Sequence, residues 1–137
     1  MLQSHLDRLG GAGLSGQIQC MDMTAGCINT LYRMNLVQST GFLYDCYFFA
    51  PAQTRATGEL RIKFWHAVSL NPPRVFVVSN QFCLGQTPGY SKLQNWQQFD
   101  EYLAEHYHIT EERIPPHLVR WWSLTQAPLG YRIYVRK

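Results

Sequence analysis

The stretch ELRIKFWHAVSLNPPRVFVVSNQF, residues 59–82, decides the expected fold. In its first half, Leu60, Ile62, Phe64 and Val68 share one face with His66, an alternation that is typical of a half-buried β-strand. Asn71-Pro72-Pro73 then predicts a turn. Residues 74–82 are more uniformly apolar, as expected of a strand that is buried on both faces. We therefore expect two consecutive strands that pair as an antiparallel hairpin.

Two segments upstream of this stretch carry regular apolar patterns. Between Met21 and Gln38 the apolar residues recur at steps of three and four, the period of an amphipathic helix of about five turns. Residues 42–49 are dense in aromatic side chains and end at Ala50-Pro51, as expected of a buried strand. A long core helix is therefore predicted ahead of the sheet.

The C-terminal part alternates between helix and strand signals. Apolar side chains from Leu93 to Leu103 have helical spacing, and the helix is expected to end at residues 106–108. Residues 117–124 predict a short helix, and Gly130 precedes a final strand over residues 131–137. The order of elements indicates an α+β domain whose long N-terminal helix packs on a mainly antiparallel sheet.

Length and composition fit one domain. The chain has 137 residues, of which 46% are hydrophobic and 15% charged, enough for one core but too few for two. Glycine dominates residues 10–16, after a short helix predicted over Leu2–Leu9. We therefore expect a flexible glycine-rich leader over residues 1–16 and a single domain over residues 17–137.

Charge and hydropathy disfavour several classes of partner. The net charge is +3, but the basic residues are spread along the chain, so nucleic-acid binding is not indicated. No apolar run approaches the ~20 residues that cross a bilayer, and the first residues lack the order of a secretory signal. We expect a cytoplasmic protein without nucleic-acid or membrane partners.

The chain has four cysteines, Cys20, Cys27, Cys46 and Cys83. They form no C-x-x-C pair, so neither a zinc knuckle nor a thioredoxin motif is present. A disulfide framework is not expected in a cytosolic chain of this size, and the last three cysteines are interpreted as packing residues. The spacing of His106, His108 and His117 fits no metal-ligand pattern. No metal or organic cofactor is predicted.

One order of residue types could carry chemistry. Cys20 lies at the start of the predicted long helix, His66 lies in the next alternating segment, and Ser79-Asn80 follow near the end of the next strand. A helix N-terminus favours a thiolate, and a histidine can accept and return its proton. We interpret Cys20 as a candidate nucleophile and His66 as its general base and acid. Ser79 or Asn80 would orient the imidazole.

The same helix start would supply an oxyanion hole from main-chain N–H groups and the side chain of Gln17 or Gln19. Cys20 and His66 also have structural explanations that need no catalysis. Cys20 fits a buried small residue, and His66, on the apolar face of its predicted strand, fits a hydrogen-bonded core histidine.

This order resembles the transglutaminase-like and papain-like cysteine superfamily, and more narrowly the bacterial transglutaminase-like cysteine proteinases, over about residues 16–90. The matching motifs are Gln19-Cys20-Met21-Asp22, Asn29-Thr30-Leu31-Tyr32, His66-Ala67-Val68 and Val77-Val78-Ser79-Asn80-Gln81-Phe82. The resemblance implies a transglutaminase/papain-like core and acyl transfer or amide hydrolysis on a peptide or small-molecule substrate, without a cofactor. The family usually carries Asp where this chain has Ser79, which supplies no charge to stabilise an imidazolium. The resemblance therefore implies a weakened catalytic set.

A second hypothesis is a binding or interaction module without catalysis. Four tryptophans are candidates for a ligand pocket or a homo-oligomer surface: Trp65, Trp96, Trp121 and Trp122. Adjacent tryptophans on a helix cannot both face inward, so one of the last two is expected at a cleft or an interface. A third hypothesis is an unrelated α+β fold in which the order of Cys20 and His66 is a coincidence.

Overall fold

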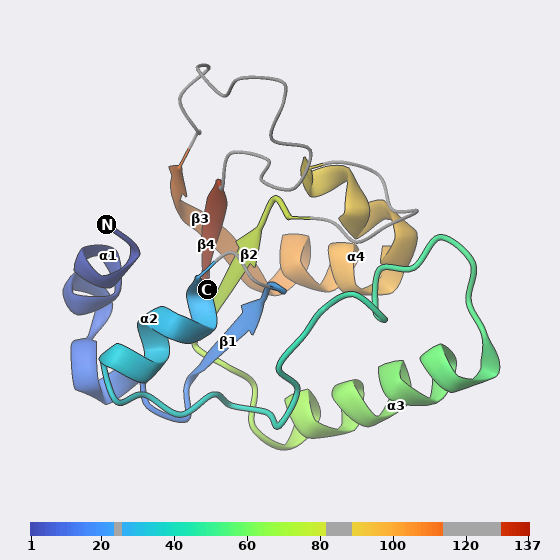
Figure 1. Cartoon of the computed structure of the whole chain (residues 1–137), viewed down its shortest axis with the longest axis horizontal. Helices are drawn as coiled ribbons and strands as arrows, with labels where there is room; N and C mark the ends of the chain where they lie inside the picture. The colour runs from blue at the N-terminus through green and yellow to red at the C-terminus, as the bar shows by residue number, and fades with distance from the viewer. Residues whose placement is uncertain (24–25, 82–88, 114–129) are drawn as a thin grey trace.

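The computed structural model describes residues 1–23, 26–81, 89–113 and 130–137 (Figure 1). The elements in chain order are helix α1 (Leu2–Leu9), 3₁₀ helix η1 (Gly11–Leu14), strand β1 (Ile18–Met21), helices α2 (Cys27–Arg33) and α3 (Arg55–Leu70), strand β2 (Val75–Ser79), 3₁₀ helix η2 (Gly89–Trp96), helix α4 (Gln97–His106), and strands β3 (Tyr107–Arg113) and β4 (Tyr131–Arg136). This confirms an α+β domain.

The described strands form a mixed sheet in the order β1-β2-β4-β3. Strand β1 runs parallel to β2, with Ile18 opposite Val75 and Met21 opposite Val78. Strand β4 pairs antiparallel with both β2 and β3. The expected sheet was mainly antiparallel, and the parallel β1–β2 pair is the exception.

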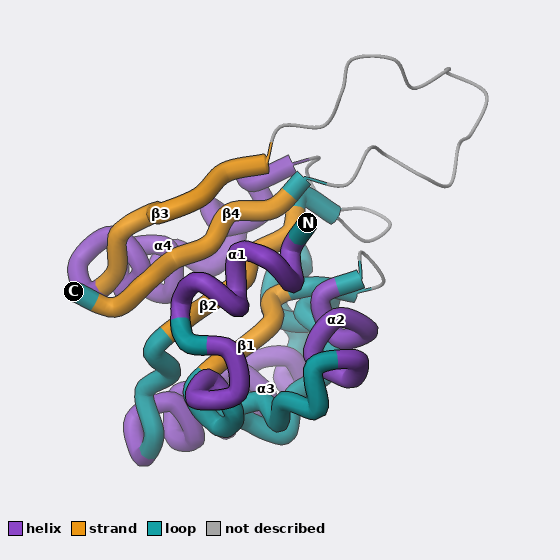
Figure 2. The backbone as a smooth tube through the Cα atoms, turned by 90° about the vertical axis from the view of Figure 1, so that its left-hand side faces the viewer, coloured by secondary structure: helices purple, strands orange, loops and turns teal. Residues whose placement is uncertain are grey.

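Helices cover both faces of the sheet. Successive strand residues point to opposite sides, so β1, β2 and β4 contribute side chains to both cores. Cys20 and Val77 lie in one core with residues of α1, η1 and α2. Met21 and Phe76 lie in the other core with residues of α3, η2 and α4. Figure 2 shows α1 in front of the strands and α4 behind them.

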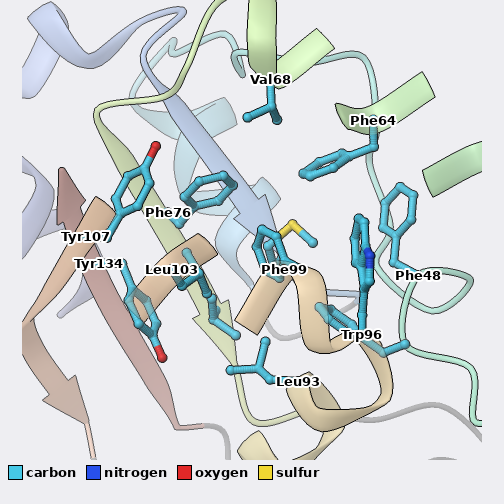
Figure 3. Close-up of a cluster of buried hydrophobic side chains, with 13 residues drawn as sticks. Phe48, Phe64, Val68, Phe76, Leu93, Trp96, Phe99, Leu103, Tyr107 and Tyr134 are labelled. Carbon is cyan, nitrogen blue, oxygen red and sulfur yellow. The ribbon is translucent and has the colours of Figure 1, made fainter. Parts of the chain in front are cut away.

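The core under α3 and α4 is strongly aromatic (Figure 3). Trp96 lies between the rings of Phe48 and Phe99, at centroid distances of 5.3 and 5.1 Å, and Phe64 lies 5.5 Å from it. Burying one large apolar side chain stabilises a fold by about 1.5–3 kcal/mol. This cluster therefore fixes the position of α3 and α4 on the sheet.

The predicted strand over residues 59–70 is wrong, because this segment is the helix α3. Leu60, Phe64 and Val68 are four residues apart, so the same apolar positions satisfy a helical period as well as an alternating one. Thr54 begins the helix with a capping box, in which its hydroxyl accepts a hydrogen bond from the backbone N–H of Thr57. The expected hairpin is consequently absent, and β2 follows a helix and pairs in parallel with β1.

The long helix expected over residues 21–38 is also wrong. Its first residue, Met21, ends β1, and α2 covers only Cys27–Arg33. Gly26, with φ of 102°, begins α2, and Asn35, with φ of 54°, follows its end. Both conformations lie outside the right-handed helical region and interrupt a continuous helix.

The aromatic segment 42–49 is irregular rather than a strand, although Phe48 and Phe49 are buried as expected. Residues 1–16 also differ from the expected flexible leader. The predicted short helix is present as α1, and Leu6 and Leu14 lie fully buried in the core under α1 and α2. This segment packs as part of the domain.

The C-terminal predictions agree better with the structure. The helix expected around Leu93–Leu103 is present as η2 and α4, and the final strand is present as β4. Strand β3 was not predicted, because its exposed polar pattern resembles a loop. The helix predicted over residues 117–124 lies outside the described residues.

Candidate functional site

The predicted nucleophile is not at a helix N-terminus. Cys20 lies in β1, is 2% exposed and forms a disulfide with Cys27, with the two Cα atoms 6.0 Å apart. Cys46 is also disulfide-bonded. The expectation that Cys27 and Cys46 are packing thiols and that the chain has no disulfide framework is therefore wrong. In the oxidised protein the Cys20 sulfur is bonded and cannot attack a carbonyl carbon.

His66 does not meet Cys20. It lies on the exposed side of α3, whereas Cys20 points into the core on the opposite face of the sheet. The prediction that His66 lies on an apolar strand face is wrong, because in helix α3 it is offset from the buried positions Phe64 and Val68. The geometry contains no Cys20–His66 pair.

The two residues expected to orient His66 have other contacts. Ser79, the last residue of β2, donates a hydrogen bond from Oγ to Oδ1 of Asp22 at 2.9 Å. Asn80 accepts a hydrogen bond from the N–H of Gly130 at 2.9 Å through Oδ1. These bonds join the end of β2 to Asp22 and to Gly130, whereas His66 lies on the exposed side of α3.

The two glutamines expected in an oxyanion hole are structural. Gln19 is 1% exposed; its amide nitrogen donates to the carbonyl of Phe42 at 3.1 Å, and its amide oxygen accepts the hydroxyl of Thr40 at 2.6 Å. These bonds hold residues 40–42 beside the edge of β1. The carbonyl of Gln17 accepts the N–H of Val75 at 3.0 Å, between the starts of β1 and β2.

A buried polar group that the sequence analysis did not single out lies beyond the carboxyl ends of β1 and β2. We call it the buried cluster and define it as Asp22, Asp45, Ser79 and Lys92, all at most 3% exposed. Lys92 Nζ lies 2.6 Å from Asp45 Oδ2 and 2.7 Å from the carbonyl oxygen of Gln81. The main chain of Asp45 donates to the carbonyl of Asp22 at 3.1 Å.

Burial raises the pKa of the Asp45 carboxyl, because the anion loses its hydration, and the ammonium of Lys92 opposes this rise. The cluster has little free space. A neighbouring cavity of about 20 Å³ touches Asp22 and Ser79 and has room for about one water molecule. The arrangement therefore suits internal support of the strand ends better than binding of an organic substrate.

A hollow to which Trp65 contributes lies between α3, α4 and β4, with a volume of about 390 Å³. We call it the aromatic groove. Its lining residues are Trp65, Val68, Ser69, Pro72, Tyr102, His106 and Arg136. The volume falls within the usual range for small-molecule sites.

Aromatic rings form the wall of the groove. The indole of Trp65 meets the ring of Tyr102 edge to face, with centroids 5.0 Å apart and an interplanar angle of 85°. The imidazole of His106 lies 4.9 Å from the same tyrosine ring. Residues on α3 and α4 thus present adjoining ring surfaces, as flat organic ligands require.

Arg136 is the positively charged group of the groove lining. Its guanidinium only donates hydrogen bonds, whereas the hydroxyls of Ser69 and Tyr102 and the imidazole of His106 can donate or accept. The lining itself has no carboxylate. Glu105 lies outside it, with Oε2 3.7 Å from Nε2 of His106.

Of the other three tryptophan candidates, only Trp96 lies among the described residues. Trp96 is 3% exposed and belongs to the aromatic core, where the guanidinium of Arg61 lies 4.9 Å from its ring centroid. Trp121 and Trp122 lie outside the described residues. Trp65 is the candidate that lines the aromatic groove.

Comparison with known proteins identifies no relative of this chain. No family model, no curated protein and no solved structure matches the chain.

Within residues 1–23, 26–81, 89–113 and 130–137, no group of His, Cys, Asp and Glu side chains could hold a metal ion. The helices of the same part of the chain are too short or too polar to cross a membrane. The function must therefore be argued from the geometry of the site.

Proposed function

We propose that the domain is a binding module whose aromatic groove takes a small organic ligand with a flat apolar ring and an anionic group. The observation that carries this proposal is the meeting of Trp65 and Tyr102 with Arg136 in one hollow of about 390 Å³. Concave sites that combine aromatic walls with a few directed polar groups are the usual form of a ligand site.

The ring of the ligand would lie against Trp65 and Tyr102. Val68 and Pro72 extend this apolar surface. Burial of apolar area supplies most of the affinity in such a site, and stacking or edge contacts between rings add about 0.5–1.5 kcal/mol.

The charge preference follows from the donors. Arg136 can form two parallel hydrogen bonds with a carboxylate or a phosphate. The lining has no carboxylate that would repel such a group. We therefore propose an anionic ligand over a cationic one.

Cysteine-dependent acyl transfer has less support than ligand binding. That mechanism needs a free thiolate within reach of an imidazole. Cys20 is held in a disulfide, and its side chain and His66 belong to opposite faces of the sheet. A non-catalytic module agrees better with this geometry.

Titration calorimetry with three ligands of one shape tests the proposal. Indole-3-acetate is anionic, indole-3-acetamide neutral and tryptamine cationic. For ligands of this size a Kd of about 0.1–1 mM is expected for the anion. We expect the amide to bind more weakly and the amine not to bind measurably. Equal binding of all three, or of none, would contradict the proposal.

The matched variants are Arg136→Gln in the groove and Arg33→Gln on α2, which lies on the other face of the sheet. Arg136→Gln is expected to weaken indole-3-acetate binding by about tenfold, because a charge-assisted pair is lost. Arg33→Gln should leave binding unchanged. A similar loss in both variants would mean that net charge, and not the groove, attracts the ligand.

A further inference from the structure

The described disulfide cysteines are neighbours of the buried acids. Cys20 and Cys27 lie on either side of Asp22 in the sequence and are bonded to each other. Cys46 directly follows Asp45 and is also disulfide-bonded. Covalent links therefore occur beside both carboxylates of the buried cluster.

The carboxylate of Asp22 connects the same two elements as the Cys20–Cys27 disulfide. Its Oδ2 accepts the N–H of Cys27, the first residue of α2, at 3.0 Å. Its Oδ1 accepts the hydroxyl of Ser79 on β2 at 2.9 Å. Because the disulfide fixes the start of α2 against β1, it also fixes the donor that holds this carboxylate.

The connection continues from Asp22 to the ion pair. The carbonyl of Asp22 accepts the N–H of Asp45 at 3.1 Å, and the Asp45 carboxylate lies 2.6 Å from Lys92 Nζ. Lys92 is fully buried. A buried ion pair is stable only while its geometry and remaining hydrogen bonds are maintained. Displacement of Asp22 would therefore expose this pair to water.

We propose that the Cys20–Cys27 disulfide is a redox-sensitive latch on the buried cluster. Reduction would release the start of α2 from β1, loosen the contacts of Asp22 and open Lys92 to solvent. Closing the latch converts two thiols and one disulfide oxidant, such as oxidised glutathione, into the protein disulfide and two glutathione thiols. One cysteine thiolate attacks the oxidant, and the second then displaces glutathione from the mixed disulfide.

This inference also bears on where the chain folds. Structural disulfides form and persist in oxidising compartments and are rare in the cytosol. A chain that depends on the Cys20–Cys27 bond reaches its native structure where disulfides are formed. The proposal thus differs from the cytoplasmic expectation, which rested on the lack of a long apolar run and of a secretory signal.

The test begins with the oxidised wild-type protein, without and with excess dithiothreitol. The disulfides are mapped by alkylation and peptide mass spectrometry, and the reactivity of Lys92 towards an amine-acylating reagent is read from the same peptides. We expect reduction of Cys20–Cys27 to lower Tm by about 5–10 °C and to raise the labelling rate of Lys92 at least tenfold. Unchanged Tm and labelling after confirmed reduction would overturn the proposal.

The double variant Cys20→Ser/Cys27→Ser separates this bond from the disulfide of Cys46. It should show fast Lys92 labelling without any reductant. If it does not fold, partial reduction of the wild type takes its place, and Lys92 labelling must then rise in proportion to the reduced fraction of Cys20–Cys27. Labelling that follows the Cys46 disulfide instead would refute the latch.

Discussion

Lys92 Nζ lies 2.6 Å from Asp45 Oδ2, and the two side chains are 0% and 4% exposed. The phenyl ring of Phe49 is 5.4 Å from the same ammonium. A pair removed so completely from water depends on both of its members, since either charge left alone would keep the full cost of dehydration.

Lys92→Met is therefore expected to destabilise the fold by about 3–5 kcal/mol, because Asp45 would remain buried without a counter-charge. Urea unfolding followed by circular dichroism measures this loss. Lys92→Met/Asp45→Leu should recover a large part of it, whereas Lys63→Met on the exposed side of α3 should change stability by less than about 0.5 kcal/mol. An equal loss in the single and double variants would show that the ion pair is not the cause.

Two substitutions in α3 distinguish a helix from the strand that the alternation indicates. In a strand, Ile62 and Phe64 would share a face, but in α3 Ile62 is 69% exposed and Phe64 is fully buried. Phe64→Ala is expected to cost about 3–5 kcal/mol and Ile62→Ala less than about 0.5 kcal/mol. Comparable losses in urea unfolding would contradict the helical assignment.

The N-terminal cap of α3 can be tested separately. Thr54 Oγ1 accepts the N–H of Thr57 at 3.2 Å, and Thr57 Oγ1 accepts the N–H of Thr54 at 2.8 Å. Thr54→Ala should reduce the free energy of unfolding by about 1 kcal/mol, whereas Thr54→Ser keeps the acceptor and should be nearly neutral. The prediction fails if serine is as damaging as alanine.

Alkaline pH should destabilise the protein through its buried phenols. Burial raises the pKa of Tyr90 to about 12, and the pKa of Tyr107 is raised further by burial and its bond to Tyr102. Above about pH 10 the unfolded chain loses these protons while the folded chain retains them, so stability falls as pH rises.

Urea unfolding at pH 9, 10 and 11 measures this trend, and absorbance near 295 nm follows the phenolates. Tyr107→Phe should flatten the pH dependence, although it also removes the hydrogen bond from the Tyr107 hydroxyl to the carbonyl of Pro73, 2.6 Å long. A stability that is constant from pH 9 to 11 would contradict the raised pKa values.

The sequence predicted those elements that had a single periodicity. α4 was predicted because Phe99 and Leu103 have helical spacing, and β4 because Gly130 precedes a segment rich in aromatic and β-branched residues. Residues 59–70 fit both periods, because Leu60, Phe64 and Val68 are four residues apart, and only the capping box at Thr54 favours the helix. Local patterns also cannot reveal the parallel pairing of β1 with β2, which depends on contacts between distant segments.

The candidate site was predicted only in part. Trp65 was named from its residue type, but Tyr102, His106 and Arg136 join it from separate elements that no local pattern links. The bond between Cys20 and Cys27 was missed because cysteine spacing alone does not determine pairing. The burial of Lys92 could not be predicted from the sequence, because lysine is almost never buried unless it is paired.

The most direct test of the binding proposal is the NMR signal of the Trp65 indole N–H during titration with indole-3-acetate and, separately, with tryptamine. The chain has four tryptophans, so Trp65→Phe assigns the resonance. The proposal predicts a saturable shift of the Trp65 signal with the anion, larger than that of Trp96, and little shift with the amine. No shift with either compound, or equal shifts with both, would contradict a groove for anionic aromatic ligands.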